Sequence, residues 1–501
     1  MRSKIALKNA LATALTEIVV LVCGILVPKI TIEYYGSNIN GLIASIGSVL
    51  SIIALGEAGI GGVVRAAYYE PLAKNNTKGI NDIWNCSKRY FSILGFIFIP
   101  FVAIVTGYFC FFKSSGIPIN IVLALCLIVS AQQFLQYFFA LPNRLLLYAD
   151  NKAAKLKTWE TITSIANLVA VYLLVKINAG VVVVKAGSTL AYMIAPVLIG
   201  IYGYRNYQLK RTKDYDRNVL EQKWDGLGHH IAYYVNNNID IIALTFLSTA
   251  VNVSVYAVYN FVVTSLNKII TVLSEGTDAL FGNIIAKGET KALQKNLSVY
   301  ESLVFYVSSV LFSVAFVMLI PFIKIYTGKF DNIEVYINPV FGYVLLAAAL
   351  ATTIRIPYNH IITAAGHYRQ TKKYAYIEAV INVFVSCACV FQFGLVGVAI
   401  GTALAAIYRT SVYVWYLKNN ILQRSPWVAI KKIALLCVSV IIVILVSYIF
   451  PIQNDGGILN WVVSAVIFTV FAAVVAGILF MLSCRQDVKE FKQLLMNAIR
   501  K

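Results

Sequence analysis

Residues 457–483 read GILNWVVSAVIFTVFAAVVAGILFMLS and contain no charged side chain. A helix of about 20 predominantly apolar residues is long enough to cross the hydrocarbon core of a bilayer, so this stretch predicts a transmembrane helix. The rest of the chain has the same character, because 59% of its 501 residues are hydrophobic and only 13% are charged, with a mean hydropathy of +0.75. This composition argues against a soluble enzyme, a disordered protein and a disulfide-rich scaffold.

Further apolar stretches, separated by polar breaks, predict about fourteen transmembrane helices. Each stretch is too long for a strand of a membrane barrel, so the expected fold class is an all-α integral membrane protein. The expected spans are 11–33, 40–62, 90–112, 117–141, 158–177, 180–204, 229–250, 252–273, 300–327, 335–358, 374–393, 394–418, 432–451 and 457–483.

The second half of the chain repeats features of the first half in the same order. Six spans per repeat is an even number, so both halves have one orientation, which predicts parallel repeats around a central cavity. The matching features are Ala73–Lys78 with Ala286–Lys291, Pro142 with Pro357, Asn167 with Asn382, and Gly180–Ser188 with Gly394–Thr402. The predicted parts are an N-terminal six-helix half (1–204), a cytoplasmic linker (205–228), a C-terminal six-helix half (229–418), two additional helices (432–483) and a basic amphipathic tail (484–501).

The basic residues predict which side of the membrane each connection occupies. The chain has 42 Lys and Arg against 22 Asp and Glu, a net charge of +20. Cytoplasmic loops carry an excess of Lys and Arg, and most of these bases lie in the N-terminus, the tail and every second connection. Both termini are therefore expected in the cytoplasm, and the charge needs no nucleic-acid partner. The bases expected outside are Lys29, Lys113, Lys176, Lys185, Lys324 and Lys329.

The sequence contains no pattern typical of catalysis or of a bound metal. The eight Cys form no CxxC pair, the four His have no zinc spacing, and no Walker A loop is present. The outer connections are short, which argues against a membrane-embedded glycan polymerase or glycosyltransferase. We expect no enzymatic activity, no metal and no cofactor; a non-transporting scaffold is a weaker alternative.

Polar residues inside the expected eighth span follow one helical face. Charged groups in hydrocarbon are costly and usually face a cavity, so this stripe predicts a cavity lining. The alternative is a polar seam that hydrogen-bonds to a neighbouring helix. The stripe consists of Asn260, Thr264, Asn267, Lys268, Thr271, Glu275 and Asp278.

Three other spans contain polar candidates. Asp240 lies near the middle of the seventh span, where it either binds substrate or a coupling ion or is satisfied by its own asparagines, Asn236 and Asn237. Glu17 lies deep in the first span, followed by Pro28, which is expected to bend the helix, and Lys29. The second span ends in a glycine-rich stretch, which permits an unwound helix end. This stretch predicts a gate formed by Glu57 and Arg65. Glu275 lies at the corresponding point of the second repeat. Arg355 and Arg409 are lesser candidates.

Two segments carry a resemblance to a known family. The first runs from Leu55-Gly56-Glu57-Ala58-Gly59-Ile60 through Arg65 to Tyr69-x-Pro71-Leu72-Ala73, and the second joins Asn238-Ile239-Asp240-Ile241-Ile242 to Val255-Tyr256-Ala257-Val258-Tyr259. With them, the chain resembles the Wzx-type polysaccharide flippases of the MATE-like MOP superfamily. The resemblance implies alternating-access export of an oligosaccharide on undecaprenyl diphosphate across the bacterial cytoplasmic membrane. The implied partners are this substrate, membrane lipids, a polysaccharide polymerase and glycosyltransferases.

The resemblance also implies roles for the candidate residues. Lys268, Arg65, Lys29 and Arg409 would attract the diphosphate, while Asn237, Asn260, Asn267, Asp240 and Tyr256 would contact the substrate. Glu17, Glu57, Asp240 and Glu275 would bind a coupling ion, H+ or Na+, or form a gate. The first span lacks a dense arginine trio, which favours a capsule, exopolysaccharide or O-antigen unit over a peptidoglycan precursor. The rival function is a cation-coupled multidrug antiporter of MATE type, which would prefer a mainly acidic cavity.

Overall fold

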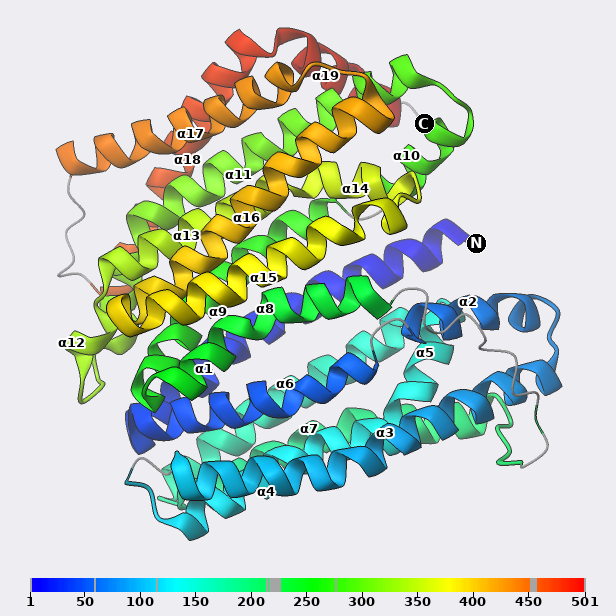
Figure 1. Ribbon diagram of the computed structural model, residues 1–501, viewed down its shortest axis with the longest axis vertical. Coiled ribbons are helices and arrows are strands. Elements are labelled where there is room, and N and C mark those ends of the chain that lie inside the picture. The colour runs from blue at the N-terminus through cyan, green and yellow to red at the C-terminus, as the bar shows by residue number, and fades with distance from the viewer. Residues whose placement is uncertain are drawn as a thin grey trace. The chain divides into compact units, whose positions relative to one another are not determined.

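A computed structural model describes residues 2–57, 60–113, 116–212, 215, 227–274, 277–450 and 457–499 (Figure 1). All regular structure within these ranges is helical. The chain divides into two compact units, which we describe separately. Unit 1 comprises Met1–Thr245 and Thr249–Ala257, and unit 2 comprises Phe246–Ser248 and Val258–Lys501.

Unit 1 contains seven long helices together with short helical segments at their ends. In chain order they are α1 (Arg2–Leu50), the 3-10 segment η1 (Ser51–Gly56), α2 (Ile60–Ala73), α3 (Thr77–Phe112), α4 (Ile119–Leu135), the π-helical turn η2 (Gln136–Ala140), α5 (Leu141–Ala149), α6 (Ala153–Lys176), α7 (Val181–Asn206), α8 (Leu227–Leu247) and the first residues of α9 (Ala250–Leu273). Its interior is built from buried aromatic and aliphatic side chains such as Trp84, Tyr68 and Phe98.

Unit 2 contains the rest of α9 and the helices that follow it. They are α10 (Thr277–Ala286), α11 (Thr290–Thr327), α12 (Ile333–Tyr336), α13 (Pro339–Ile354), α14 (Ile356–Ala364), α15 (Tyr368–Phe393), α16 (Leu395–Leu417), the π-helical turn η4 (Lys418–Leu422), α17 (Pro426–Ile449), α18 (Gly457–Ser483) and α19 (Arg485–Ile499). Helix α11 packs against α17 and α18, so these two additional helices are attached to unit 2 through α11.

Twelve helical segments of the described residues are long and apolar enough to cross a membrane. The expected spans 11–33 and 40–62 lie in one segment, Leu11–Gly56, in which two helices meet at Gly36 (φ 82°, ψ 166°), between the two expected spans; the first of these helices continues through Pro28. Glycine adopts this positive φ without steric cost. The expected span 229–250 corresponds to α8 (Leu227–Leu247), whose side chains are described only from residue 234 on, so the described part is too short to be counted among the twelve. The number fourteen therefore stays a prediction.

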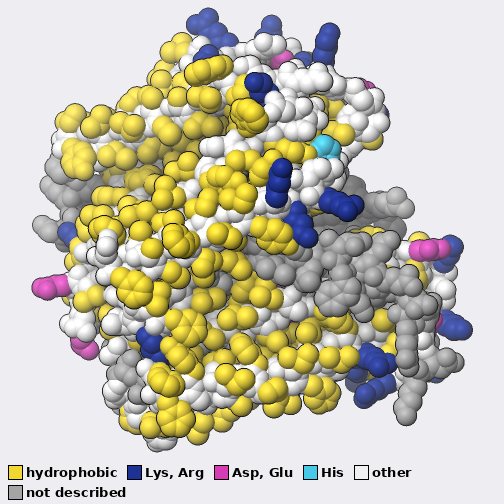
Figure 2. All heavy atoms as spheres, viewed as in Figure 1, with side chains coloured by type: hydrophobic (Ala, Val, Ile, Leu, Met, Phe, Trp, Pro, Cys, Tyr) yellow, Lys and Arg dark blue, Asp and Glu magenta, His cyan; other side chains and the backbone are white. Residues whose placement is uncertain are grey.

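The surface is as apolar as a bilayer requires. Hydrophobic side chains cover most of the face shown in Figure 2, and Lys and Arg side chains gather toward its edges. Helix α18 is an example, because Leu459, Ile467 and Leu482 along its length are all more than half exposed. Exposed apolar side chains at this density indicate contact with lipid.

Residues that the repeat pairs with one another occupy similar places in the two units. Pro142 and Pro357 lie in the first turns of α5 and α14, where a missing backbone N–H is tolerated. Asn167 in α6 and Asn382 in α15 are each only 1% exposed. This is what the repeat predicts for these positions, and the layout of the two repeats stays a prediction.

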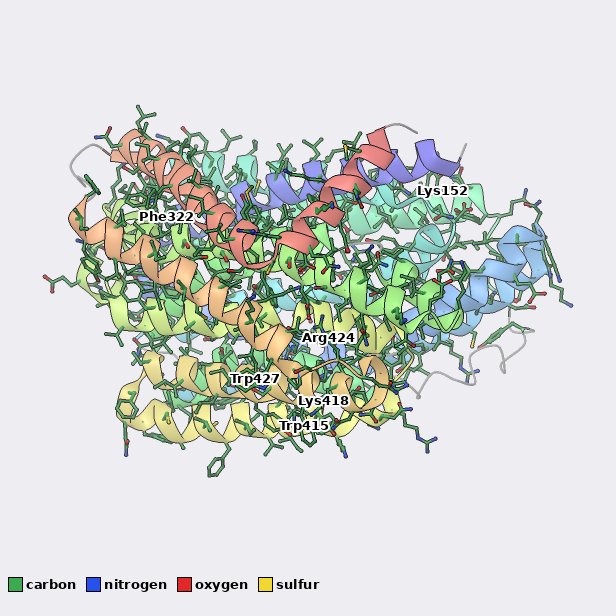
Figure 3. The ribbon with its side chains drawn as sticks, turned by 90° about the horizontal axis from the view of Figure 1, so that it is seen from above. Lys152, Phe322, Trp415, Lys418, Arg424 and Trp427 are labelled. Carbon is green, nitrogen blue, oxygen red and sulfur yellow. The ribbon has the colours of Figure 1, made fainter. Side chains whose placement is uncertain are left out.

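Helix α19, expected as a surface tail, is attached to unit 2 by buried charges. Asp487 pairs with Lys432 at 2.8 Å and accepts a hydrogen bond from Ser298 at 2.9 Å. Lys432 also contacts the fully buried Glu301 at 3.3 Å, and Glu301 receives both terminal nitrogens of Arg424, which lies just before α17 (Figure 3). The first turn of α19 is thus fixed to α11 and α17.

Replacing Asp487 with asparagine is expected to loosen α19, because hydrogen bonds to a charged group contribute about 1–3 kcal/mol. Burial by itself raises the pKa of Asp487, but hydrogen bonds from Lys432, Ser302 and Ser298 and the Lys432 charge hold the pKa below its ordinary value of 3.8. The stabilisation that this carboxylate gives to the attachment of α19 is therefore fully present above pH 3.8. It is lost only as the pH falls through the lowered pKa. Hydrogen exchange of residues 485–493 measures the loosening at neutral pH. The exposed Lys489→Gln is the control, and equal exchange in both variants would contradict the attachment.

Candidate functional site

Four charged side chains form consecutive ion pairs inside unit 1, and a fifth, Glu57, lies within electrostatic range of the last of them. We call these five residues the unit 1 charge chain. It consists of Glu17, Lys157, Glu160, Arg144 and Glu57. Lys157 lies 3.5 Å from Glu17 and 3.1 Å from Glu160, and Arg144 lies 3.6 Å from the other oxygen of Glu160. Glu57 lies within electrostatic range of Arg144 but makes no ion pair with it in the part of the chain that the structure describes, and it hydrogen-bonds to Tyr137. The charge chain thus draws its residues from α1, α6, α5 and the segment before α2.

Local packing explains why Glu17 meets Lys157. The Thr16 hydroxyl donates to the backbone carbonyl of Lys157 at 3.0 Å and lies 2.8 Å from the Thr161 hydroxyl. About two turns earlier, the Asn9 side chain donates to the carbonyl of Asn151 at 3.0 Å. These bonds hold α1 against the start of α6, so the residue after Thr16 reaches the lysine.

Glu57 lies at a break in the helix, as the glycine-rich sequence predicts. The chain passes from α1 into η1 at Ser51 and begins a new helix at Ile60. The Tyr90 hydroxyl donates to the carbonyl of Gly56 at 2.7 Å, satisfying a backbone group that the break leaves without a helical partner. The hydrogen-bond partner of Glu57, Tyr137, is in the π-helical turn η2, and such turns are frequent at functional sites.

The charge chain has the composition of a cation or proton site. It contains three carboxylates and two bases, and its four paired side chains, Glu17, Lys157, Glu160 and Arg144, are 17–27% exposed. A carboxylate in such a half-buried group can replace its pairing with a base by a bound cation. Neither charge has to be fully removed from water for this replacement. The buried Nε of Arg144 has no hydrogen-bond partner among the residues that the structure describes, so this guanidinium retains a free donor.

Arg65 of the expected gate and Lys29, which was expected to attract the substrate, lie elsewhere. Arg65 is exposed on α2, and the base within electrostatic range of Glu57 is Arg144. Lys29 is half-buried on α1, twelve positions beyond Glu17. Lys157, Glu160 and Arg144 were not identified from the sequence as site residues, because bases next to a span boundary also mark the cytoplasmic side. The pair Lys157 and Glu160, three positions apart on one helical face, was the available signal.

Asp240 and Tyr256 lie together in the interior of unit 1. They are 4% and 3% exposed, and the Tyr256 hydroxyl donates to the carboxylate of Asp240 at 2.7 Å. A partner of Asp240 is thus a tyrosine of α9, and Asn237 is exposed. Both residues were expected at the site, and the structure brings them into direct contact.

The α9 stripe is an exposed polar face in unit 2. Thr264, Lys268 and Thr271 are exposed, whereas Asn260 is half-buried. Asn267 accepts a hydrogen bond from Thr353 at 2.7 Å, so this asparagine also connects α9 to α13. Placing an exposed lysine and two exposed hydroxyls in contact with lipid would cost free energy. This face is therefore expected to contact water.

The stripe is shorter than the sequence predicts. Helix α9 ends at Leu273, so Asp278 belongs to a separate helix, α10, where it hydrogen-bonds to His360 of α14. Residues three or four positions apart share one face only within a continuous helix. After the break, Asp278 therefore need not lie on the same face as the polar residues of α9. Glu275 lies outside the described residues.

Two arginines share one buried glutamate in unit 2, and we call Arg355, Glu378 and Arg409 the unit 2 arginine cluster. Glu378 is 4% exposed and receives Arg355 on one oxygen and Arg409 on the other, the latter at 2.5 Å. Arg409 also donates to the Tyr413 hydroxyl and lies 4.7 Å from the centre of its ring. The cluster has one net positive charge. Arg409, expected to attract substrate, is therefore already engaged by a glutamate that the sequence analysis did not single out.

No protein-family model matches this chain, and no curated protein matches it either. Solved structures do match. A structure described as "Lipid II flippase MurJ, inward closed conformation" has a TM-score of 0.72 at 14% sequence identity, covering 94% of this chain and 98% of the other. An inward-facing multidrug resistance MATE family transporter of the MOP superfamily has a TM-score of 0.63 at 17% identity, covering 82% and 99%. The chain thus has the fold of these membrane transporters and is a multi-pass membrane protein.

Proposed function

We propose that the protein is a flippase for a lipid-linked oligosaccharide. It moves a repeat unit on undecaprenyl diphosphate across the bacterial cytoplasmic membrane by alternating access, with both termini in the cytoplasm, to supply capsule, exopolysaccharide or O-antigen assembly. The observation that carries the proposal is the fold, which matches a lipid II flippase over 94% of the chain. We further propose that it acts as a transporter and not as an enzyme. Its proposed partners are a polysaccharide polymerase and glycosyltransferases.

The distribution of charge supports an anionic substrate. The unit 2 arginine cluster has one net positive charge, and Lys268 is exposed on the polar face of α9. A lysine binds phosphate as a compact point charge. The positive charge of the arginine cluster makes the electrostatic potential around the cluster more positive, which attracts an anion. In this proposal Lys268 and the cluster attract the diphosphate, and Asn260 contacts sugar hydroxyls.

The unit 1 charge chain supports coupling to a cation. Its three carboxylates outnumber its two bases, so it can accept H+ or Na+ more readily than an anion. No cofactor is needed for this step. The same acid excess favours the second candidate function, a cation-coupled multidrug antiporter, because the matching MATE structures are described as multidrug resistance transporters.

Deleting the gene is expected to leave lipid-linked repeat units in the inner leaflet and to remove the surface polysaccharide. Extraction of lipid-linked sugars and staining of surface polysaccharide in the deletion strain measure both results. Normal surface polysaccharide, in a strain without a second flippase, would contradict the proposal. If the strain instead becomes sensitive to cationic drugs and keeps its polysaccharide, the antiporter is the correct function.

Two point variants test the proposed site. Lys268→Ala is expected to reduce export about tenfold or more, since a lost phosphate contact of about 1.4 kcal/mol corresponds to a factor of ten. Tyr256→Phe leaves the Asp240 carboxylate in place but removes its 2.7 Å hydrogen bond, so it tests this pair without removing the charge. Export is measured at equal membrane abundance. Unchanged export in both variants would remove these residues from the site.

A further inference from the structure

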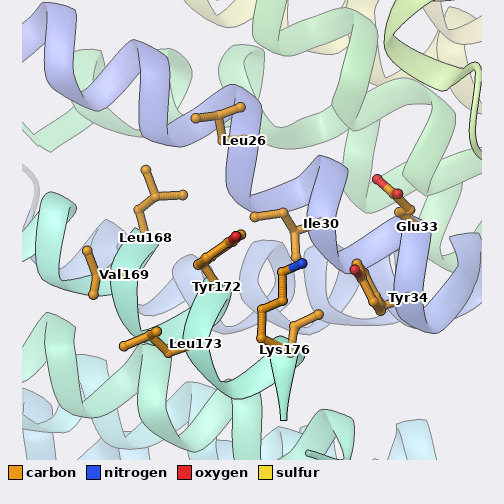
Figure 4. A pocket seen from close by; sticks show the side chains of 10 residues that line it. Leu26, Ile30, Glu33, Tyr34, Leu168, Val169, Tyr172, Leu173 and Lys176 are labelled. Atoms are coloured by element: carbon orange, nitrogen blue, oxygen red, sulfur yellow. The ribbon is translucent and has the colours of Figure 1, made fainter. Parts of the chain in front are cut away.

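A groove of about 530 Å³ lies between α1 and α6 of unit 1 (Figure 4). It is formed by the same two helices that carry Glu17 and Lys157, but further along each of them, at residues 26–34 of α1 and 168–176 of α6. Its walls are mainly aliphatic, with Leu26 from α1 and Leu173 from α6 among them. The four polar side chains along it are Glu33, Tyr34, Tyr172 and Lys176.

Most of the side chains along the groove are exposed, and exposed apolar side chains of this kind indicate contact with lipid. Leu26, Tyr172 and Leu173 are 37%, 50% and 57% exposed. An acyl chain lying in this groove gains little from the aliphatic wall, because lipid tails are as apolar as leucine. Any preference for one lipid over another must therefore come from its headgroup.

The polar end of the groove combines one base, one acid and two phenols. Lys176 is in the last turn of α6, and its amine lies 5.6 Å from the centre of the Tyr172 ring. Figure 4 shows this amine projecting toward Ile30 and Tyr34 of α1, with Glu33 next to Tyr34 on the same helix. An amine and a phenol hydroxyl both donate hydrogen bonds to phosphate, whereas a carboxylate accepts them from an ammonium group.

We infer that this groove binds one phospholipid with a zwitterionic, primary-amine headgroup, that is, phosphatidylethanolamine. Its phosphate lies at Lys176 and Tyr34, its ammonium group lies toward Glu33, and an acyl chain follows Leu26 and Leu173. An anionic headgroup such as phosphatidylglycerol meets Lys176 favourably but is repelled by Glu33. A choline headgroup carries no N–H to donate to that carboxylate. The lysine lies on the side that the base distribution predicts to be outside, which assigns the lipid to the outer leaflet.

Native mass spectrometry of the full-length protein in detergent tests this site. Phosphatidylethanolamine, phosphatidylcholine and phosphatidylglycerol with identical acyl chains are titrated in turn, and the first is expected to bind most tightly. Lys176→Gln is expected to weaken phosphatidylethanolamine binding about threefold to fivefold, which is the range for one exposed charge pair. Glu33→Gln is expected to narrow the difference between phosphatidylethanolamine and phosphatidylglycerol.

The matched control is Lys324→Gln, a change of an equally exposed lysine in the last turn of α11 in unit 2, which is expected to leave binding unchanged. Because Lys176 is itself exposed, its variant keeps the fold, and an unchanged melting temperature in lipid-free detergent checks this. Equal binding of the three lipids would overturn the inference. So would equal binding by the Lys176 and Lys324 variants, or a preference of the wild type for phosphatidylglycerol.

Discussion

Replacing Glu378 with leucine is expected to destabilise unit 2 by about 3–5 kcal/mol, the usual cost of removing one partner from a buried ion pair. The variant leaves Arg355 and Arg409 without their shared carboxylate, and Arg409 is only 8% exposed. A guanidinium cannot lose its proton to escape this cost. The measurement is the melting temperature of the purified protein in detergent, together with its abundance in the membrane.

The same change at an exposed position separates this effect from a general loss of charge. Glu334→Leu, on the exposed surface of α12, is expected to leave the melting temperature nearly unchanged. Adding Arg409→Met to Glu378→Leu is expected to restore part of the stability, because a buried ion pair can be replaced by apolar side chains of similar volume. If Glu378→Leu melts at the wild-type temperature, the cluster does not hold α13, α15 and α16 together.

The fold could be predicted from the sequence because each span carries its own hydropathy signal. A stretch such as 457–483 is identified as a membrane helix without knowledge of any neighbour, and the structure has α18 at Gly457–Ser483. The differences arise where a backbone choice matters. At Pro28 the helix continues, and at Gly36 it breaks, because glycine adopts a positive φ without steric cost.

The candidate site could be predicted only in part. Glu17 and Glu57 were found because a carboxylate within an apolar span is conspicuous, and both belong to the unit 1 charge chain. Glu378 carries the same signal within 374–393, and it was missed. Its pairing with Arg409 and the pairing of Glu17 with Lys157 depend on contacts between helices far apart in the sequence, which a periodic pattern along one helix does not contain.

Replacing Arg144 with glutamine is expected to reduce export about tenfold or more, which corresponds to about 1.4 kcal/mol in the rate-limiting step. Arg144 pairs with Glu160 at 3.6 Å and lies within electrostatic range of Glu57, so its loss removes a positive charge that two carboxylates share. Export at equal membrane abundance is the measurement, with the exposed Lys78→Gln as control.

Three variants decide whether Arg144 acts in transport or only in folding. Arg144→Lys keeps the charge and is expected to recover most of the export. Arg144→Gln combined with Glu57→Gln removes one base and one acid, so it is expected to recover membrane abundance but not export. Arg65→Gln tests the base that the sequence places beside Glu57. If Arg65→Gln abolishes export while Arg144→Gln does not, the gate lies at the exposed arginine of α2, and the unit 1 charge chain has a structural role.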